Sequence, residues 1–110
     1  MSDRTELRLT RCEDGVTAVL AEHALAEENL ATTRQQLFAA ADDIGTGELR
    51  LDLAEVATLG TSACGMLVTL HRRLAHAGGR LTLHRVAPHL RQLLRLSRLD
   101  TILDVRSEPT

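Results

Sequence analysis

The sequence predicts an α/β domain with a mixed sheet of four to five strands and with helices packed mainly on one face. Segments that alternate apolar and polar residues indicate strands, and longer segments with leucine and alanine at helical spacing separate them. In chain order the segments give β-β-α-β-α-β-α-β, and this alternation is typical of an α/β domain. The 110 residues, of which 44% are hydrophobic, predict one domain over residues 1–110.

The N-terminal part predicts a hairpin followed by a long helix. We expect strands near residues 6–12 and 16–21, because both stretches alternate and the Asp14-Gly15 pair between them suits a tight turn. The next segment, "EENLATTRQQLFAAADDI", has apolar side chains at near-helical spacing and acidic residues that complement the dipole at its start. Its predicted inward residues are Leu30, Leu37, Ala41 and Ile44.

The middle of the chain predicts a strand and a second helix. The segment "ELRLDLAEV" alternates leucine with charged residues, as half-buried strands do. From Ser62 to about Ala77 the period becomes helical, and we expect the leucine side of this helix to face the sheet, with Cys64 partly inward. The predicted inward residues are Ala63, Leu67, Leu70 and Leu74.

The C-terminal part predicts a strand, a third helix and a short edge strand. The glycines of "AGG" end the second helix, and "RLTLHRV" alternates like a strand. Pro88 suits the first position of the helix in "APHLRQLLRLSRL", and "DTILDVRS" is expected to close the sheet. In this helix we expect Leu90, Leu93 and Leu94 to face inward and Arg91, Arg95 and Arg98 to form a solvated face.

Composition argues against several classes of function. Phe38 is the only aromatic residue, lysine is absent, and the net charge is −2, so the sequence predicts no nucleic-acid partner. Residues 1–10 show no apolar leader, and no segment approaches the length of a membrane span. We therefore expect a cytoplasmic protein with no direct membrane insertion. Cys12 and Cys64 lack CxxC spacing, so we expect two reduced and mostly buried thiols.

No cofactor and no metal site are predicted. The histidines at 71, 76, 84 and 89 include no pair with the i, i+4 spacing of a zinc helix. An enzyme that uses Cys64 or Asp52 remains an alternative, but no triad, phosphate loop or metal set accompanies either residue. Asp52, at a strand end, is expected to accept backbone hydrogen bonds from the following loop.

The stretch "TLGTSACG", Thr58 to Gly65, joins the central strand to the second helix. Thr61 or Ser62 is expected to act as the N-cap, because a hydroxyl can satisfy an unpaired N–H of the first turn. A hydroxyl exposed at a helix start also suits a phosphate acceptor, and the residues alone leave both interpretations open. At about 100° per residue, the helix predicts one solvent-side stripe: Ser62, Met66, Thr69 and Arg73.

From residue 49 onward the sequence resembles a STAS domain, the module of bacterial anti-sigma factor antagonists. The family shows a strand ending in Asp-Leu-Ser, a loop with Asp-Ser-Ser-Gly, a helix, a Gly-Gly pair before the next strand and a leucine-rich final helix. The matching segments, in order, are "LDLAEV", "GTSACG", "AGGRLTL", "VAPHLRQLLRL" and "RLDTIL". The hairpin and first helix fit the same plan more loosely.

The resemblance implies a partner switch in which the protein is a ligand and a substrate and is no enzyme. The unphosphorylated antagonist would bind an anti-sigma factor that is also a serine kinase of the histidine-kinase-like ATPase type. Phosphorylation of Ser62, or alternatively of Thr61, would release it, and a PP2C-type phosphatase would reset the system. The implied partner-binding residues are Glu22, Gly60, Thr61, Ser62, Met66, Thr69 and Arg73.

Several positions depart from the family pattern: Ala63 stands where the family has a glycine, Cys64 stands where it often has leucine, and two further positions lack the expected acids. Gly60 stands where the family has an acid before the two hydroxyls, and Ala24 stands where the second strand of the family commonly ends in aspartate. These departures keep a second interpretation open. In it the chain is a phosphorylation-independent STAS subunit of a lipid-transport ABC complex or a scaffold element of a signalling assembly.

Overall fold

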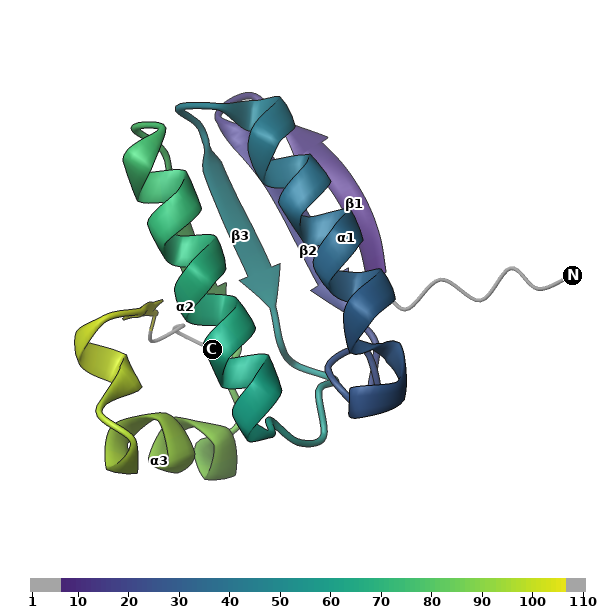
Figure 1. Cartoon of the computed structure of the whole chain (residues 1–110), viewed down its shortest axis with the longest axis vertical. Coiled ribbons are helices and arrows are strands. Elements are labelled where there is room, and N and C mark those ends of the chain that lie inside the picture. Colours follow the sequence, from purple (N-terminus) through teal and green to yellow (C-terminus); the bar gives the residue numbers. More distant parts are fainter. Residues whose placement is uncertain (1–6, 107–110) are drawn as a thin grey trace, which may run out of the picture.

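The computed structural model describes residues 7–106, and the first half of this range forms the hairpin and the central crossover (Figure 1). The hairpin strands are β1 (Leu7–Cys12) and β2 (Gly15–Leu20). Helix α1 (Glu27–Ile44) and strand β3 (Glu48–Asp52) follow. The predicted strand start at residue 6 lies outside the described residues.

The second half begins with helix α2 (Thr61–His76) and strand β4 (Arg80–His84). After them come helix α3 (Pro88–Leu96), a short 3-10 helix η1 (Leu99–Thr101) and the two-residue strand β5 (Asp104–Val105). Pro88 opens α3, as the sequence predicts. The end of the predicted closing segment, residue 107, lies outside the described residues.

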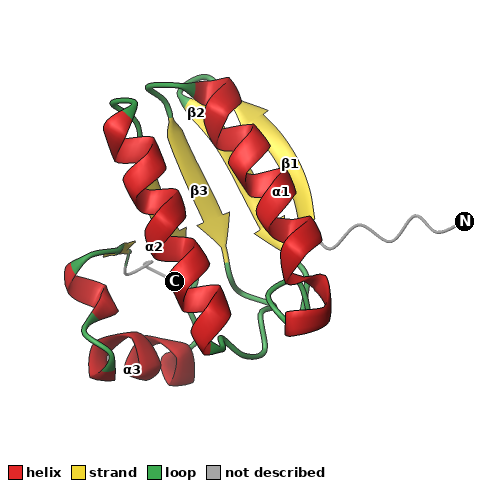
Figure 2. Ribbon diagram, viewed as in Figure 1, coloured by secondary structure: helices red, strands yellow, loops and turns green. Residues whose placement is uncertain are grey.

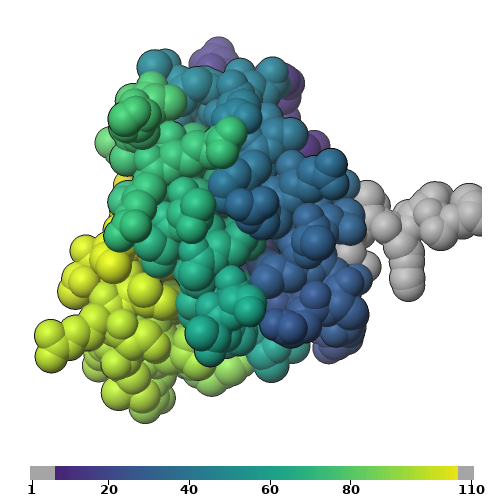
Figure 3. All heavy atoms as spheres, in the orientation of Figure 1, coloured from purple at the N-terminus to yellow at the C-terminus, as the bar shows by residue number. Residues whose placement is uncertain are grey.

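The strands form one mixed five-stranded sheet in the order β1-β2-β3-β4-β5. β1 is antiparallel to β2, and all other neighbours are parallel. Because α1 connects β2 to β3 and α2 connects β3 to β4, the two long helices lie side by side over one face of the sheet (Figure 2). The predicted fold class and the predicted order of elements along the chain are therefore confirmed. In Figure 3, α3 and η1 flank the lower half of α2 on the side away from α1.

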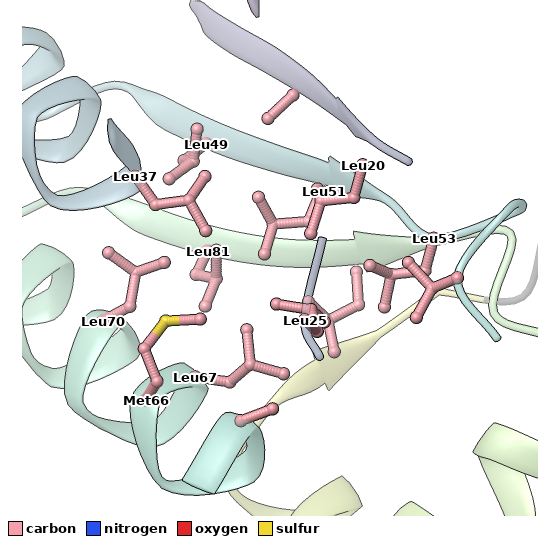
Figure 4. Packing of buried hydrophobic residues seen from close by; sticks show 14 of the residues in the cluster. Leu20, Leu25, Leu37, Leu49, Leu51, Leu53, Met66, Leu67, Leu70 and Leu81 are labelled. Atoms are coloured by element: carbon pink, nitrogen blue, oxygen red, sulfur yellow. The ribbon is translucent and has the colours of Figure 1, made fainter. Parts of the chain in front are cut away.

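The core is built mainly from leucine, with smaller contributions from alanine and valine, and lies between the sheet and the two long helices. Leu49 and Leu51 of β3 are fully buried, and Leu81 and Leu83 of β4 lie beside them in register. Figure 4 shows leucines of α2 pointing toward these strands. All four residues predicted to face inward from α2 are buried: Ala63, Leu67, Leu70 and Leu74.

The other face of the sheet carries a layer of polar side chains. Thr82 on β4 is fully buried there, and its hydroxyl donates to Glu48 Oε2 at 2.7 Å. Since that hydroxyl has one proton, His84 Nε2 must donate to Thr82 Oγ1 across the 2.9 Å that separates them. Arg50 on β3 pairs with Asp14 at 2.9 Å. The sheet therefore has one apolar face under the helices and one hydrogen-bonded polar face.

Two details of the sequence prediction concern loop and edge positions. Gly78 has φ +86°, which confirms a glycine stop after α2 because this left-handed region favours glycine. The expectation that both thiols are mostly buried is wrong for Cys12, which is exposed. Cys12 lies at the end of β1 on the sheet face away from the helices, where its Sγ is 3.8 Å from Thr17 Oγ1. Cys64 is half-buried.

Candidate partner-binding site

The loop between β3 and α2 is held in a fixed conformation over residues 53–60. Its apolar residues Val56 and Leu59 are buried, 3% and 5% exposed. Leu53 N–H donates to His84 C=O at 2.9 Å, and Val56 N–H donates to Leu53 C=O at 3.1 Å. The loop is therefore part of the packed domain. It holds the exposed residues at the start of α2 in a fixed position.

Ala57 is the point where three distant segments meet. Its N–H donates to the Glu22 carbonyl in the β2–α1 loop at 3.2 Å. Its own carbonyl lies 2.9 Å from His89 Nε2 in the first turn of α3, and a carbonyl can only accept, so His89 Nε2 carries the proton. The sequence analysis assigned no role to His89, because no sequence pattern predicts that α3 contacts this loop.

The first turn of α2 presents two hydroxyls to solvent. Gly60 is the N-cap, and Thr61 and Ser62 occupy the first two helical positions with exposed side chains. The prediction that Thr61 or Ser62 caps the helix is therefore wrong, since the helix begins one residue earlier and no side chain within residues 7–106 caps it. The first turn contains no acidic residue. Its open N–H groups and the helix dipole thus favour an added negative charge.

Met66 is buried, at 5% exposed, so the prediction of a solvent-side methionine that contacts a partner is wrong. At about 100° per residue, Met66 lies about 40° from Ser62 on the side nearer the leucines. Helix α1 packs along α2 and covers that edge. Figure 4 shows the Met66 side chain turned toward the strands beside Leu67 and Leu70.

The other residues of the predicted stripe are exposed but differ in their contacts. Thr69 is exposed, and its hydroxyl donates to the Gly65 carbonyl at 3.0 Å. Arg73 makes a two-point ion pair with Asp42 of α1 at 2.8 and 3.0 Å, and it lies over the Phe38 ring. Its hydrogen bonds lower the pKa of Asp42. Arg73 therefore joins the two long helices, about 16 Å along α2 from Ser62.

Glu22 and Ala24 lie in the β2–α1 loop beside Ala57. The Glu22 side chain is exposed, and its Oε1 lies 3.8 Å from His23 Nε2. Ala24 is fully buried, and its carbonyl accepts a hydrogen bond from the buried Thr33 hydroxyl at 2.7 Å. At the position of the second family acid, this chain therefore has a core residue.

A mostly apolar groove of about 380 Å³ runs beside the first turns of α2, between this helix and the segment formed by α3 and η1. Cys64 lies in its wall, and burial raises the pKa of the Cys64 thiol. A thiol with a raised pKa is mostly protonated at neutral pH and is a poor nucleophile. This geometry supports binding at the groove rather than chemistry at Cys64.

Asp52 at the end of β3 has a structural role of the kind that the sequence predicts. Its carboxylate accepts the Ala54 N–H at 3.0 Å and pairs with Arg85 at 2.5 to 3.3 Å. Burial of Asp52 raises its pKa, but the hydrogen bonds from Arg85 and Ala54 outweigh burial and the net pKa is lowered. Asp52 is therefore ionised at neutral pH and holds the start of the loop.

Residues 7–106 contain no group of three or more side chains that could hold a metal ion. Within the same range, no helix combines the length and the apolar character that crossing a membrane requires.

These features define an α/β domain whose exposed loop and helix start lie at the carboxyl ends of its parallel strands. The chain belongs to the STAS domain family, because the family model described as "Mlab, STAS domain" matches residues 9–104. No curated protein sequence matches the chain.

Solved structures of the same fold include anti-sigma factor antagonists. A STAS domain protein from Planctomyces limnophilus superposes with a TM-score of 0.83 at 18% identity, covering 96% of this chain and 92% of that one. An antagonist from Mycobacterium paratuberculosis gives 0.78 at 17% identity, covering 93% and 85%. The phosphorylated form of the Bacillus cell fate determinant SpoIIAA gives 0.66 at 17% identity, covering 93% and 92%.

Proposed function

We propose that this chain is an anti-sigma factor antagonist-like regulatory protein that binds a serine-kinase anti-sigma factor and is released by phosphorylation of Ser62. The observation that carries the proposal is the exposed Ser62 hydroxyl in an uncapped first turn, on a rigid loop and beside an apolar groove. In this scheme the protein acts by binding and is not a catalyst. Its place of action is the cytoplasm, where the kinase and ATP are.

The partner surface would combine the acceptor turn with the loops beside it. Gly60 and Thr61 precede Ser62 in the chain, Glu22 lies in the loop that bonds Ala57, and all three residues are exposed. Thr69 continues the same exposed side of α2 two turns later. Met66 is excluded from this surface by its burial, and Arg73 is occupied by Asp42.

Phosphorylation suits this position because it alters binding more than folding. The kinase would transfer the γ-phosphoryl group of ATP to Ser62 Oγ, with ADP leaving and the hydroxyl proton passing to a base of the kinase. A phosphoserine adds about −1.5 to −2 charges, which the start of a helix tolerates. Burying that charge against a surface shaped for a hydroxyl costs on the order of 3 kcal/mol, or roughly a hundredfold in affinity.

The experiment is phosphorylation of the full chain by a histidine-kinase-like ATPase that copurifies with it from the native host. We expect mass spectrometry to locate the phosphate on Ser62, and a PP2C-type phosphatase to remove it. The Ser62→Ala variant should bind the kinase and resist modification, while Thr61→Ala should still be modified. Phosphate on Thr61 would move the acceptor by one residue, and binding that survives phosphorylation would contradict the switch.

A second candidate is a phosphorylation-independent STAS subunit of a lipid-transport ABC complex or a signalling scaffold. Two observations favour it: Gly60 offers no side chain where the family has an acid, and Ala24 is buried where the family has another. The same copurification separates the two candidates. Transporter subunits, together with an unmodified Ser62 in cells, would support the second candidate and refute the first.

A further inference from the structure

The groove beside the acceptor turn has apolar walls contributed by both of its sides. Helix α2 contributes the half-buried side chains of Cys64 and Val68, and the opposite wall contains Leu93 of α3 and Leu99 of η1. Leu96 follows Leu93 by three residues and is 76% exposed, the most exposed large apolar side chain among residues 7–106. An isolated domain leaves this apolar surface in water, so a partner that covers it gains free energy.

An exposed arginine lies near each wall of the groove along the chain. Arg72 follows Val68 by one helical turn on the same side of α2, and Arg98 stands between Ser97 and Leu99 at the opposite wall. Both side chains are exposed, and neither forms an ion pair with any residue from 7 to 106. The nearby Asp100 lines a different hollow with Arg95. The residues that line the groove are therefore uncharged, while Arg72 continues its α2 side by one turn and Arg98 stands in the chain of its opposite wall.

We propose that this groove binds an acidic amphipathic segment of the partner protein, whose apolar side chain enters between α2 and α3 while its carboxylates pair with Arg72 and Arg98. This inference rests on the proposed function, because it names the docking element of that partner. The volume of about 380 Å³ accommodates one or two large apolar side chains. Guanidinium groups bind carboxylates in a two-point geometry, which selects an acidic segment over a basic one.

The location of the groove links this docking element to release. Thr61 lines the groove, and Ser62 is its neighbour in the same helical turn. A phosphate on Ser62 would therefore add negative charge beside the end of the groove that Thr61 lines, about 15 Å along α2 from Arg72. Repulsion would weaken docking only for that part of the acidic segment that reaches the acceptor turn.

The test uses a library of short random peptides displayed on phage and selected on the immobilised full chain. Enriched peptides should combine a large apolar residue with neighbouring aspartate or glutamate. A labelled synthetic copy of the most enriched peptide should bind about tenfold more weakly to the Arg72→Glu/Arg98→Glu variant, because two attractions become repulsions. The matched control is Arg8→Glu, which reverses an exposed arginine on β1 at the far side of the sheet.

Thiol labelling locates the bound peptide without any substitution. With N-ethylmaleimide, the peptide should slow modification of Cys64 in the groove wall and leave Cys12 on β1 unaffected. Enrichment of peptides without net negative charge, equal loss of affinity in Arg8→Glu, or no protection of Cys64 would overturn the proposal. Binding of the groove to phosphatidylglycerol vesicles instead, or to a second copy of the chain in sedimentation, would overturn it as well.

The failures of the two proposals are distinguishable. If the acidic peptide binds the groove but no kinase modifies Ser62, the docking surface stands and the phosphorylation switch does not. If a kinase binds and modifies Ser62 while the Arg72→Glu/Arg98→Glu variant binds it as the native chain does, the switch stands and the groove proposal is wrong.

Discussion

Replacing Ser62 by aspartate should strengthen the fold while it weakens partner binding. Ser62 is exposed in a first turn that contains no acidic residue and no side-chain cap within the described range. A carboxylate there meets the positive end of the helix dipole and open N–H groups, worth about 0.3–1 kcal/mol. The serine hydroxyl has no hydrogen bond to any residue from 7 to 106, so its removal costs almost nothing.

The assay is thermal and urea unfolding of the full chain at low ionic strength. A gain of 0.3–1 kcal/mol should raise the melting temperature of a domain of this size by roughly 2–6 °C, and salt should reduce the gain. Ser62→Lys should shift the melting temperature in the opposite direction. Thr69→Asp is the matched control, because it lies on the same exposed side two turns later, where the effect of the helix end has faded.

Partner binding should respond with the other sign. We expect Ser62→Asp to lower the affinity for the kinase-type partner by roughly a hundredfold, since a charge replaces a hydroxyl at the interface. A loss of more than about 1 kcal/mol of folding stability in Ser62→Asp would refute the reasoning. Such a loss would mean that the Ser62 oxygen lies inside the domain rather than in an open first turn.

Three further predictions concern the supports of the site. Met66→Ala should lower the free energy of unfolding in urea by about 2–5 kcal/mol, because the Met66 side chain is buried. A change near zero would mean that Met66 is exposed. Asp52→Asn should cost about 1–2 kcal/mol at pH 7 through the lost pairing with Arg85. Because the folded-state pKa of Asp52 is lowered, that stabilisation is present above pH 3.8 and is lost as pH falls through the folded pKa, so variant and native stabilities should converge in acid. Cys64 should react with iodoacetamide more slowly than Cys12 at pH 8, since burial raises the pKa of Cys64, and equal rates would contradict the half-buried position.

The identity and order of the elements could be predicted from the sequence because their periods differ clearly. Leucines alternate with charged residues in β3, and they recur at helical spacing in α2. Ala63, Leu67, Leu70 and Leu74 were predicted to be buried for the same reason, and they are. The sequence analysis predicts a mixed sheet but not the order of its strands, which the structure gives as β1-β2-β3-β4-β5.

The position of Met66 could not be predicted from the α2 sequence alone. Its direction on the helix lies at the edge of the leucine side, and whether that edge is buried depends on how closely α1 approaches. The Arg73 contacts with Asp42 and Phe38 have the same origin. The interhelical packing, not the period of one helix, decides where the buried sector ends.

The contacts that build the site could not be predicted from the sequence either. Ala57 joins Glu22 and His89, which are separated from it by 35 and 32 positions in the chain, and no local motif records such a meeting. The cap at Gly60 in place of Thr61 is a shift of one residue, which is the usual uncertainty of helix ends.

The two-sided attachment of Ala57 has a consequence for any enzyme that modifies this chain. It fixes the backbone that leads into α2, so the Ser62 hydroxyl is presented on a helical segment and not on an extended one. A modifying enzyme would have to recognise the surface of the folded domain. An unfolded peptide with the same sequence would lack that surface. Only copies of the chain that have already folded would then be modified and take part in regulation.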